Sequence, residues 1–541
     1  MNDLTTHALE QALQTYQQFP AVPTSLISYQ SNGRVIIVGD DAALSLCREF
    51  AAPLKLTLIS MQAKAAPGQT DVIALNGRKI ELQGYLGNFV MRLSDQQGNT
   101  ETLRADMVLD LNAKPLLTQQ LLPAGYLHEA VTEQNKHELE ARLQEMTGEF
   151  EKPRYFNYDA SICAHGVNGK TVCTNCIDAC PAGAISSLIE TIEVDAHLCQ
   201  GGGSCATVCP SGAIQYAYPR LTDSGNRIRK MLQTFHQQGG EQAVVVFHAA
   251  PDPALDALAK KCAVLPLRVE EIASVGMDLC LSTLAYGASQ VVLLVNSEAP
   301  QLSQNQLSQQ LEWLQSMLSG LTINPQRISL QYQADQIELI EQKWGYTPAA
   351  YSMPQNKRHA IFQALDHLYQ QIERTRELVS LPLAAPFGTA SIDETRCTLC
   401  MACIGACPGK ALQDGSNREI PEIFFIESHC IQCGTCTQTC PEQAISISPR
   451  IIYNREKRNQ SRVLHQDIPF ACISCGKAFA PTSIIHKMSH KLKDHYMFKT
   501  TRALDRLKMC DDCRVADIVQ DPEAIQGSFD PLSNASAKRL S

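Results

Sequence analysis

Short apolar runs separated by turns dominate the first part of the chain. The runs RVIIVGD, KLTLIS, DVIALNG, KIELQGYLGNFVMRLSD and DMVLDL alternate with polar and Gly-containing segments. Runs of this length, rich in β-branched residues and bounded by turns, are typical of strands. The pattern predicts an α/β domain at residues 1–150.

The same pattern returns at residues 223–350. The runs EQAVVVFHA and SQVVLLVN are continuously apolar, which is typical of parallel strands buried on both faces. The periodicity also predicts helices at residues 302–319 and 334–344. One amphipathic helix is expected at residues 356–378, followed by the Pro- and Gly-containing linker LPLAAPFG. The predicted fold class is therefore α/β and multidomain.

The first apolar run ends in Gly39-Asp40-Asp41, where a dinucleotide-binding fold would continue through G-x-G-x-x-G. The complete fingerprint is absent, so a truncated Rossmann-like scaffold without FAD is expected. The phrases GYLGNFVMRLSD and LRADMVLDLN resemble the strand pair of flavin-dependent heterodisulfide-reductase-type subunits, which keeps a flavin-binding subunit as an alternative. Cys47 is expected to be a buried thiol.

A doubled cysteine spacing occupies residues 391–450, the second module. Two C-x2-C-x2-C-x3-C-P runs lie there. In such a run three thiolates bind one iron–sulfur cube, and the fourth binds the other cube. The predicted 4Fe-4S ligand sets are Cys397, Cys400, Cys403 and Cys440, and Cys430, Cys433, Cys436 and Cys407. This module resembles a bacterial two-cluster ferredoxin, and disulfides or zinc fit its doubled spacing poorly.

Residues 151–222, the first module, repeat this spacing with two departures. Lys170 stands where the leading cysteine of the first run would be, and Gly202 replaces the second cysteine of the second run. Cys163, upstream on a Gly-containing loop, can supply the missing ligand of the first run. The predicted ligands are Cys163, Cys173, Cys176 and Cys209 for a 4Fe-4S cluster, and Cys180, Cys199 and Cys205 for a three-thiolate site.

Three thiolates cannot hold every iron of a cube. The site at Gly202 is therefore expected to hold a 3Fe-4S cluster or a labile 4Fe-4S cluster whose fourth iron binds water or histidine, or to be empty. His165 and His197 are near enough in sequence to be considered as substitute ligands. Each is more typical of a hydrogen-bonding loop residue.

Residues 451–520 contain one more group of cysteines. Its spacing predicts a structural zinc site, with a fifth iron–sulfur cluster as the alternative. The four ligands are Cys472, Cys475, Cys510 and Cys513. Gly476 is expected to take a positive φ that turns its N–H toward a thiolate. His486 and His490 share a predicted helix face, but four cysteines already suffice for zinc.

The composition and charge of the chain bear on its cellular location and on its partners. The chain has 541 residues, 22 cysteines and a net charge of −9. It has no apolar run long enough for membrane insertion and no signal-like start, and cysteines spaced as metal ligands fit a reducing cytoplasm. Residues 450–514 hold 14 Lys or Arg against 6 Asp or Glu. This basic segment is expected either to dock an acidic redox protein, rather than nucleic acid, or to be a solvated surface.

The passage VLPLRVEEIASVGMDLCLSTLAYGASQVVLLV resembles the electron-transfer subunit that connects hydrogenase with heterodisulfide reductase. That family's cysteine-rich motif is missing, because only Cys262 and Cys280 occur here. Both are expected to be core residues, and the domain to dock partners without a cofactor. The predicted order is 1–150 α/β, 151–222 first module, 223–350 α/β, 351–390 helix and linker, 391–450 second module, 451–520 four-cysteine module and 521–541 disordered tail.

This order of domains resembles a proteobacterial cytoplasmic polyferredoxin family associated with formate dehydrogenase. The resemblance implies an electron carrier between a cytoplasmic dehydrogenase and another acceptor, rather than a catalyst in its own right. No Walker loop, nucleophile elbow or molybdenum-pterin signature is present to supply other chemistry. A maturation or redox-sensing factor for a partner enzyme is a further alternative, and any small-molecule substrate is left open.

Overall fold

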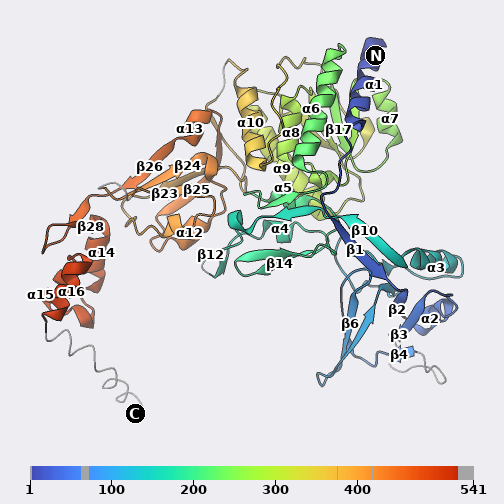
Figure 1. Ribbon diagram of the computed structural model, residues 1–541, viewed down its shortest axis with the longest axis horizontal. Coiled ribbons are helices and arrows are strands. Elements are labelled where there is room, and N and C mark those ends of the chain that lie inside the picture. The colour runs from blue at the N-terminus through green and yellow to red at the C-terminus, as the bar shows by residue number, and fades with distance from the viewer. Residues whose placement is uncertain (1–2, 62–71, 168, 374–375, 416–419, 522–541) are drawn as a thin grey trace. The chain divides into compact units, whose positions relative to one another are not determined.

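The computed structural model describes residues 3–61, 72–167, 169–373, 376–415 and 420–521 (Figure 1). The chain divides into two compact units, with the boundary between Arg376 and Glu377. The tail expected at residues 521–541 lies outside the described residues, except for Asp521. Among the described residues, no helix combines the length and apolarity needed to cross a membrane.

A five-stranded parallel sheet with the order β4-β3-β2-β8-β9 forms the centre of the N-terminal domain. Its strands are β2 (Arg34–Gly39), β3 (Lys55–Ser60), β4 (Val72–Ala74), β8 (Met107–Asp110) and β9 (Tyr126–His128). Alternate residues of β2 enter two different cores, so that Val35 and Ile37 face one side and Ile36 and Val38 the other. This two-sided burial explains why the strand is continuously apolar.

Helices cover one face of this sheet and an antiparallel meander covers the other. The helices are α2 (Asp41–Cys47) and α3 (Lys136–Glu145), whose Leu44 and Leu139 pack with Val35. The meander comprises β5 (Lys79–Gln83), β6 (Phe89–Ser94) and β7 (Thr100–Ala105), and its Met91 packs with Ile36. The domain therefore has two hydrophobic layers around one sheet.

A two-stranded ribbon leads from this domain to the first module. Strands β1 (Leu26–Ser31) and β10 (Gly148–Pro153) run antiparallel side by side (Figure 1). The N-terminal helix α1 (Asp3–Gln17) does not pack on the N-terminal sheet but on α6 (Leu221–Gln237), where Thr15 Oγ1 lies 3.2 Å from Thr234 Oγ1.

The first module consists of short strand pairs and two short helices around its cysteine loops. Phe156, Ile185, Ile192, Ala206 and Ile214 form its core. The elements are β11 (Phe156–Tyr158) with β16 (Ile214–Tyr216), β12 (Gly166–Val167) with β13 (Lys170–Thr171), β14 (Ile185–Leu188) with β15 (Thr191–Val194), α4 (Asn175–Asp178) and α5 (Ser204–Val208).

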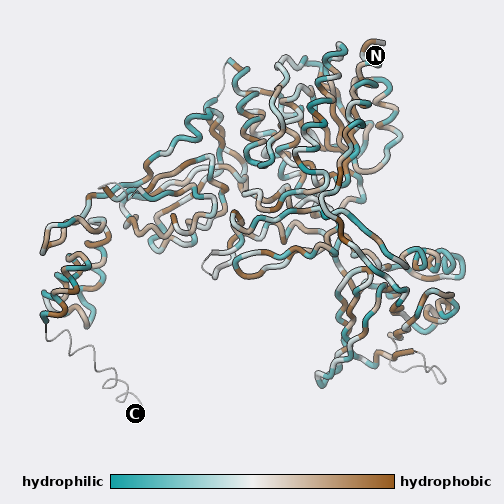
Figure 2. The backbone as a smooth tube through the Cα atoms, in the orientation of Figure 1, coloured by the Kyte–Doolittle hydropathy of each residue, from teal (hydrophilic) through white to brown (hydrophobic). Residues whose placement is uncertain are grey.

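A second parallel sheet, with the order β18-β17-β19-β20, follows the first module. Apolar segments occur both in the strands and in the helices of this domain (Figure 2). The strands are β17 (Val244–His248), β18 (Val264–Arg268), β19 (Gln290–Leu294) and β20 (Ile328–Gln331). The helices are α6, α7 (Pro253–Ala259), α8 (Met277–Ala285), α9 (Gln301–Gly320) and α10 (Lys357–Tyr369).

Two helix predictions in this region need correction. The helix expected at residues 334–344 is only a 3-10 turn, Ala334–Gln336, and the rest forms neither helix nor strand. The side chain of Gln290 explains this, because its amide bonds both Glu338 O (3.0 Å) and Ile340 N (2.8 Å) and ties the segment down as a strand partner would. The helix expected at residues 356–378 ends at Tyr369, one residue after its last buried position.

The second unit begins with the second module. Its core includes Leu399, Leu412, Ile423, Phe425 and Ile445, packed with the cysteines. The strands are β21 (Leu378–Ser380), β22 (Gly388–Ile392), β23 (Leu412–Asp414), β24 (Glu422–Ile426), β25 (Ile445–Ile452) and β26 (Ser461–Gln466). The helices are α11 (Ala402–Gly405), α12 (Thr435–Thr439) and α13 (Arg455–Asn459).

The four-cysteine module ends the described chain. A hairpin of β27 (Pro469–Ala471) and β28 (Ala478–Pro481) precedes three helices. The helices are α14 (Thr482–Leu492), α15 (Thr501–Arg506) and α16 (Asp511–Val519). Many apolar residues of this module, such as Ile468, Ile473 and Val515, are exposed, so they add little to a core.

Candidate metal centres

Two cavities in the second module are each lined by four cysteines. One, of about 330 Å³, is lined by Cys397, Cys400, Cys403 and Cys440. The other, of about 370 Å³, is lined by Cys407, Cys430, Cys433 and Cys436. In each cavity, three cysteines come from one run and the fourth comes from the other run.

The loops between these cysteines share one backbone conformation. The second residue after the leading cysteine, Leu399 or Gln432, has a φ of 50° or 53°. The fourth residue, Met401 or Gly434, has a φ of 60° or 78°. Such left-handed residues among right-handed ones form a concave nest of backbone N–H groups, which suits a negatively charged group.

Another N–H contact recurs after the last cysteine of three runs. There the residue four positions later donates its backbone N–H to the sulfur at 3.3 Å. The pairs are Ala184 with Cys180, Ala411 with Cys407, and Ala444 with Cys440. N–H donors stabilise a thiolate, which is the form that binds a metal.

Burial and mutual repulsion act on the innermost thiol of each group. Burial, with the charges of Cys397, Cys400 and Cys440, raises the pKa of Cys403 to about 12. Burial also raises the pKa of Cys436 to about 12, with the largest added contributions from Cys433, Cys430 and Cys407. Buried thiolates this close together need a compensating positive charge, which an iron centre supplies.

The first module brings a third group together. Burial, with the charges of Cys209, Cys173 and Cys163, raises the pKa of Cys176 to about 12. The β12–β13 hairpin lies between Cys163 and Cys173 and returns the chain to this site. His165 closes the hairpin, because its Nδ1 lies 2.7 Å from Cys173 O and its Nε2 lies 2.6 Å from Ser187 Oγ.

A cavity of about 420 Å³ surrounds the three remaining cysteines, Cys180, Cys199 and Cys205. Gly202 and Leu121 also line it. Gly201 and Gly203 have φ values of 76° and 79°, so this loop repeats the left-handed positions of the complete runs despite its missing cysteine. The cavity is no smaller than those of the second module, so the absence of one ligand has not closed it.

Neither histidine considered as a substitute ligand lines this cavity. Both ring nitrogens of His165 are engaged in the hydrogen bonds described above. The ring of His197 stacks on Tyr85 with centroids 4.3 Å apart. The two side chains serve the surrounding structure, as loop histidines commonly do.

Two lysines that carry no sequence motif contact the ligand loop of the first module. Lys152 Nζ donates to His197 O at 2.8 Å and to Cys199 O at 2.6 Å. Lys357, which is 8% exposed, donates to Ala206 O at 2.9 Å and to the carbonyl oxygens of Thr207 and Cys209. Both come from segments distant in sequence, so nothing in the local spacing of the cysteines indicates them.

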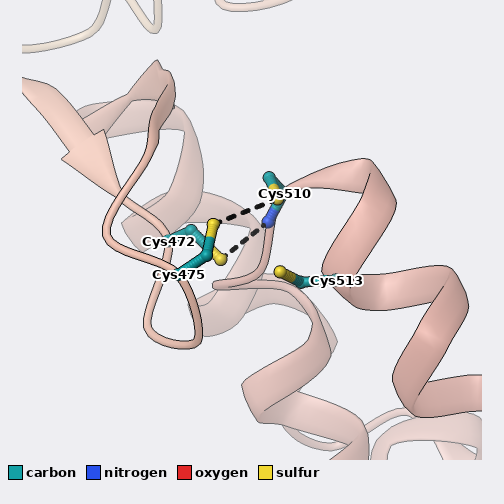
Figure 3. Close-up of side chains that lie close together, drawn as sticks. All are labelled: Cys472, Cys475, Cys510 and Cys513. Carbon is teal, nitrogen blue, oxygen red and sulfur yellow. Dashed lines mark hydrogen bonds between the residues drawn. The ribbon is translucent and has the colours of Figure 1, made fainter.

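The C-terminal cysteines form the most compact group. Figure 3 shows Cys472 and Cys475 on the β27–β28 loop facing Cys510 and Cys513 at the start of α16. The four sulfurs all lie within 4.8 Å of one another, and no other group of ligand atoms in the described ranges is this compact. Cys475 Sγ lies 3.7 Å from Cys510 Sγ.

The role predicted for Gly476 needs a partial correction. Its φ is 76°, as expected, but its N–H donates to Cys472 O at 2.8 Å and not to sulfur. The N–H that reaches Cys472 Sγ comes from Cys510, at 3.3 Å. His486 and His490 lie together on α14, outside the four-cysteine group.

The other cysteines occupy packing positions. Cys47 and Cys280 are fully buried, and Cys262 packs partly buried against the core of the second parallel sheet. Burial raises the pKa of Cys47 to about 11, so its thiol is neutral at physiological pH.

Two segments of the chain match families of iron–sulfur domains. Residues 396–445, with all eight cysteines of the second module, match a 4Fe-4S dicluster domain. Residues 192–215, with Cys199, Cys205 and Cys209, match a 4Fe-4S binding domain. The search of curated proteins gives no match. The chain is thus an iron–sulfur, ferredoxin-like protein, and these domains support a role in electron transfer.

Proposed function

We propose that this chain is a polyferredoxin that relays single electrons between a cytoplasmic dehydrogenase and another acceptor. The observation that carries the proposal is the gathering of the motif cysteines into separate groups in both modules, each beside a nest of N–H groups or in a shared cavity. Closely grouped iron–sulfur centres serve one-electron transfer, and each binds through thiolates alone.

The ligand sets follow the grouping of the thiols. We assign three 4Fe-4S clusters, two to the second module and one to the first. Their respective ligands are Cys397, Cys400, Cys403 and Cys440; Cys407, Cys430, Cys433 and Cys436; and Cys163, Cys173, Cys176 and Cys209. Cys180, Cys199 and Cys205 make the fourth centre. These groups are wider than a single ion requires, which favours clusters over zinc.

Zinc suits the C-terminal group instead. A tetrahedral zinc with Zn–S bonds of about 2.3 Å places its sulfurs about 3.8 Å apart. The separation of 3.7 Å between the sulfurs of Cys475 and Cys510 agrees with one ion, and the whole group fits within 4.8 Å. A cube interposes four irons and would hold the four sulfurs farther apart.

The α/β domains act as scaffolds and docking domains in this proposal. The order β4-β3-β2-β8-β9 corresponds to the 3-2-1-4-5 order of a doubly wound fold, which supports a Rossmann-like arrangement. The turn after β2 does not fit a dinucleotide, however. Asp40 already accepts the N–H of Ala43 at 2.8 Å, and its carboxylate would repel a pyrophosphate. A Cβ atom at Gly39 would lie 3.0 Å from Leu111 Cβ, so the side chain of Leu111 also covers the turn.

Reduction by a partner enzyme tests the proposal. The protein is purified without oxygen, and its iron, sulfide, zinc and flavin are quantified. Formate and a formate dehydrogenase are then added while cluster signals are followed by low-temperature EPR. We expect cluster reduction that depends on both additions, and no flavin. Clusters that dithionite reduces but no dehydrogenase does would contradict the relay.

Serine variants test the crossed ligand sets. Cys403→Ser should damage the cluster that uses Cys397 and Cys440, whereas Cys407→Ser should damage its neighbour, although both substitutions lie in the same run. EPR should therefore lose a different signal in each variant. The same signal lost in both would show that each run binds its own cluster. Cys262→Ser is the control and should lose none.

A further inference from the structure

Apolar side chains line the three-cysteine cavity at the position of the missing ligand. A Cβ atom at Gly202 would lie 3.5 Å from Pro181 Cγ and 3.6 Å from Leu121 Cδ1. Both of these residues line the cavity together with the three cysteines. The complete runs carry a cysteine at this place, Cys400 or Cys433. In the first module the corresponding space therefore faces a leucine and a proline.

Leu121 is held in this place from two sides. Its backbone N–H donates to Pro181 O at 3.0 Å, directly beside the cysteine loop. The neighbouring Gln120 accepts the N–H of Leu302, in the first turn of α9, at 3.0 Å. Leu117, a few residues earlier, is buried in the core of the N-terminal domain. The side chain is thus part of a packed connection between three parts of the first unit.

Two polar side chains of the cavity lining, Ser204 and Gln200, have hydrogen-bond partners elsewhere. Ser204 Oγ shares a hydrogen bond of 3.1 Å with Ser303 Oγ, and Gln200 Nε2 donates to Leu198 O at 3.2 Å. A water molecule on an iron at the open corner would meet Leu121 and Pro181, which offer no hydrogen bond. Enclosing water without polar partners is unfavourable.

We infer that the three-cysteine site holds a 3Fe-4S cluster as its resident form, and that Leu121 keeps water and other non-cysteine ligands from a fourth iron. This inference rests on the proposed iron–sulfur function. The retained left-handed positions at Gly201 and Gly203 keep the loop in its ligand-binding conformation, so the site is not a collapsed remnant. The apolar corner leaves a fourth iron with neither thiolate, carboxylate nor solvated water as its ligand.

The experiment compares the full-length wild type with two variants that supply the missing ligand. Gly202→Cys is sterically allowed, because every contact of the new Cβ is at least 3.5 Å and the backbone is not left-handed there. Leu121→Asp places a carboxylate at the same corner. Each protein is purified without oxygen, and its first-module centre is characterised by EPR in the oxidised state and by native mass spectrometry.

We expect the wild type to show the oxidised three-iron EPR signal without exposure to air. Both variants should lose that signal and gain one iron per chain. Leu122→Asp is the matched control, since Leu122 is adjacent, 38% exposed and absent from the cavity lining, and it should keep the three-iron signal. Because two independent ligands are tested, a folding failure of one variant leaves the other to decide.

Opposite results would overturn the inference. A wild-type site that holds four irons under anaerobic conditions would show that Leu121 excludes nothing. A wild type with three complete clusters and no fourth centre would show that the site is empty. In both cases the other clusters persist and the electron-transfer proposal stands. If the anaerobic protein had no cluster in either module, the proposed function itself would be wrong.

Discussion

Lys357 places a positive charge against the backbone of a metal-binding loop. Its ammonium is buried and donates to three carbonyl oxygens between Ala206 and Cys209. Lys152 contacts the other end of the same loop, at His197 and Cys199. A cluster becomes more negative on reduction, so nearby cations stabilise its reduced form and raise its potential.

The second module has two arginines beside a buried carboxylate. Arg450 and Arg462 lie 2.7 and 3.3 Å from Glu427, which is 5% exposed and neutralises part of their charge. The charge of Asp278 acts on Lys357 and that of Asp195 acts on Lys152, so carboxylates offset part of the cationic charge in both modules.

We predict that Lys152→Met lowers the reduction potentials of the first-module clusters and leaves those of the second module unchanged. The lysine is partly buried, so methionine retains its packing while removing the charge. EPR-monitored redox titration of the full chain measures the shift. The variant Lys152→Arg keeps the positive charge, so its clusters should have the wild-type potentials. If both variants behaved alike, the effect would come from packing and not from charge.

Among the elements, the hairpin β27–β28 and helix α16 are predicted to depend on a metal at the four-cysteine group. Within the described module, the buried residues include Cys472, Ile485, Leu507 and Cys510, so two of these positions are proposed zinc ligands. Such a small core supplies little stability, whereas structural zinc contributes roughly 10 kcal/mol or more in zinc-finger peptides. The metal is thus expected to provide most of the stability of the module.

Removing zinc should therefore unfold residues 467–521 while the cluster-binding core of the second module survives. Chelation followed by limited proteolysis, with metal analysis at each step, measures this. His490→Ala serves as the control, because that histidine lies outside the four-cysteine group, and it should retain zinc and resist protease. A module that stays protected after complete zinc loss would contradict the prediction.

Acid should release the same zinc. Burial opposes ionisation of Cys472, but N–H groups of Cys510, Cys475 and Ser474 outweigh it and lower the pKa of this thiol to about 6. The thiolate therefore prevails above pH 6, and protons compete with the metal below it. Zinc release, followed with a colorimetric chelator, should rise as the pH falls through about 6. Zinc release that does not change as the pH falls below 6 would contradict binding through thiolates.

Across the whole molecule, the sequence predicted features that local spacing determines. The runs that became β2, β3, β17 and β19 were predicted because buried parallel strands are continuously apolar. The cysteine groups were predicted because ligand spacing follows from the loop around a cluster. The metal-ligand assignments remain predictions for the experiments above.

Features that depend on long-range packing left no such signal. Leu121 and Lys357 reach the first module from other segments, Lys152 lies at its very beginning on β10, and each is an ordinary residue in its own surroundings. Residues 337–344 have a helix-like pattern of apolar positions, but the side-chain amide of Gln290 holds this segment by hydrogen bonds to the backbone of Glu338 and Ile340. Tertiary contacts override local propensity in such places.

The charge distribution of the chain leads to a prediction about its partner. Residues 450–514 carry 14 Lys or Arg against 6 Asp or Glu, while the chain as a whole is at −9. Of these cations, Lys491, Lys493 and Lys499 are exposed on or beside α14. An acidic redox partner should therefore be attracted to the second unit. Salt screens this attraction, because the Debye length falls from about 10 Å at 0.1 M to about 3 Å at 1 M.

We predict that the rate of cluster reduction by the partner dehydrogenase falls roughly tenfold over this salt range, as for electrostatically steered association. Stopped-flow absorbance of the full-length protein measures it. The double variant Lys493→Glu and Lys499→Glu should show a slower rate at low salt and a flatter salt dependence. Lys343→Glu, a change of the same charge at an exposed site in the first unit, should leave both unchanged. If all three proteins slowed alike with salt, net charge and not this surface would govern docking.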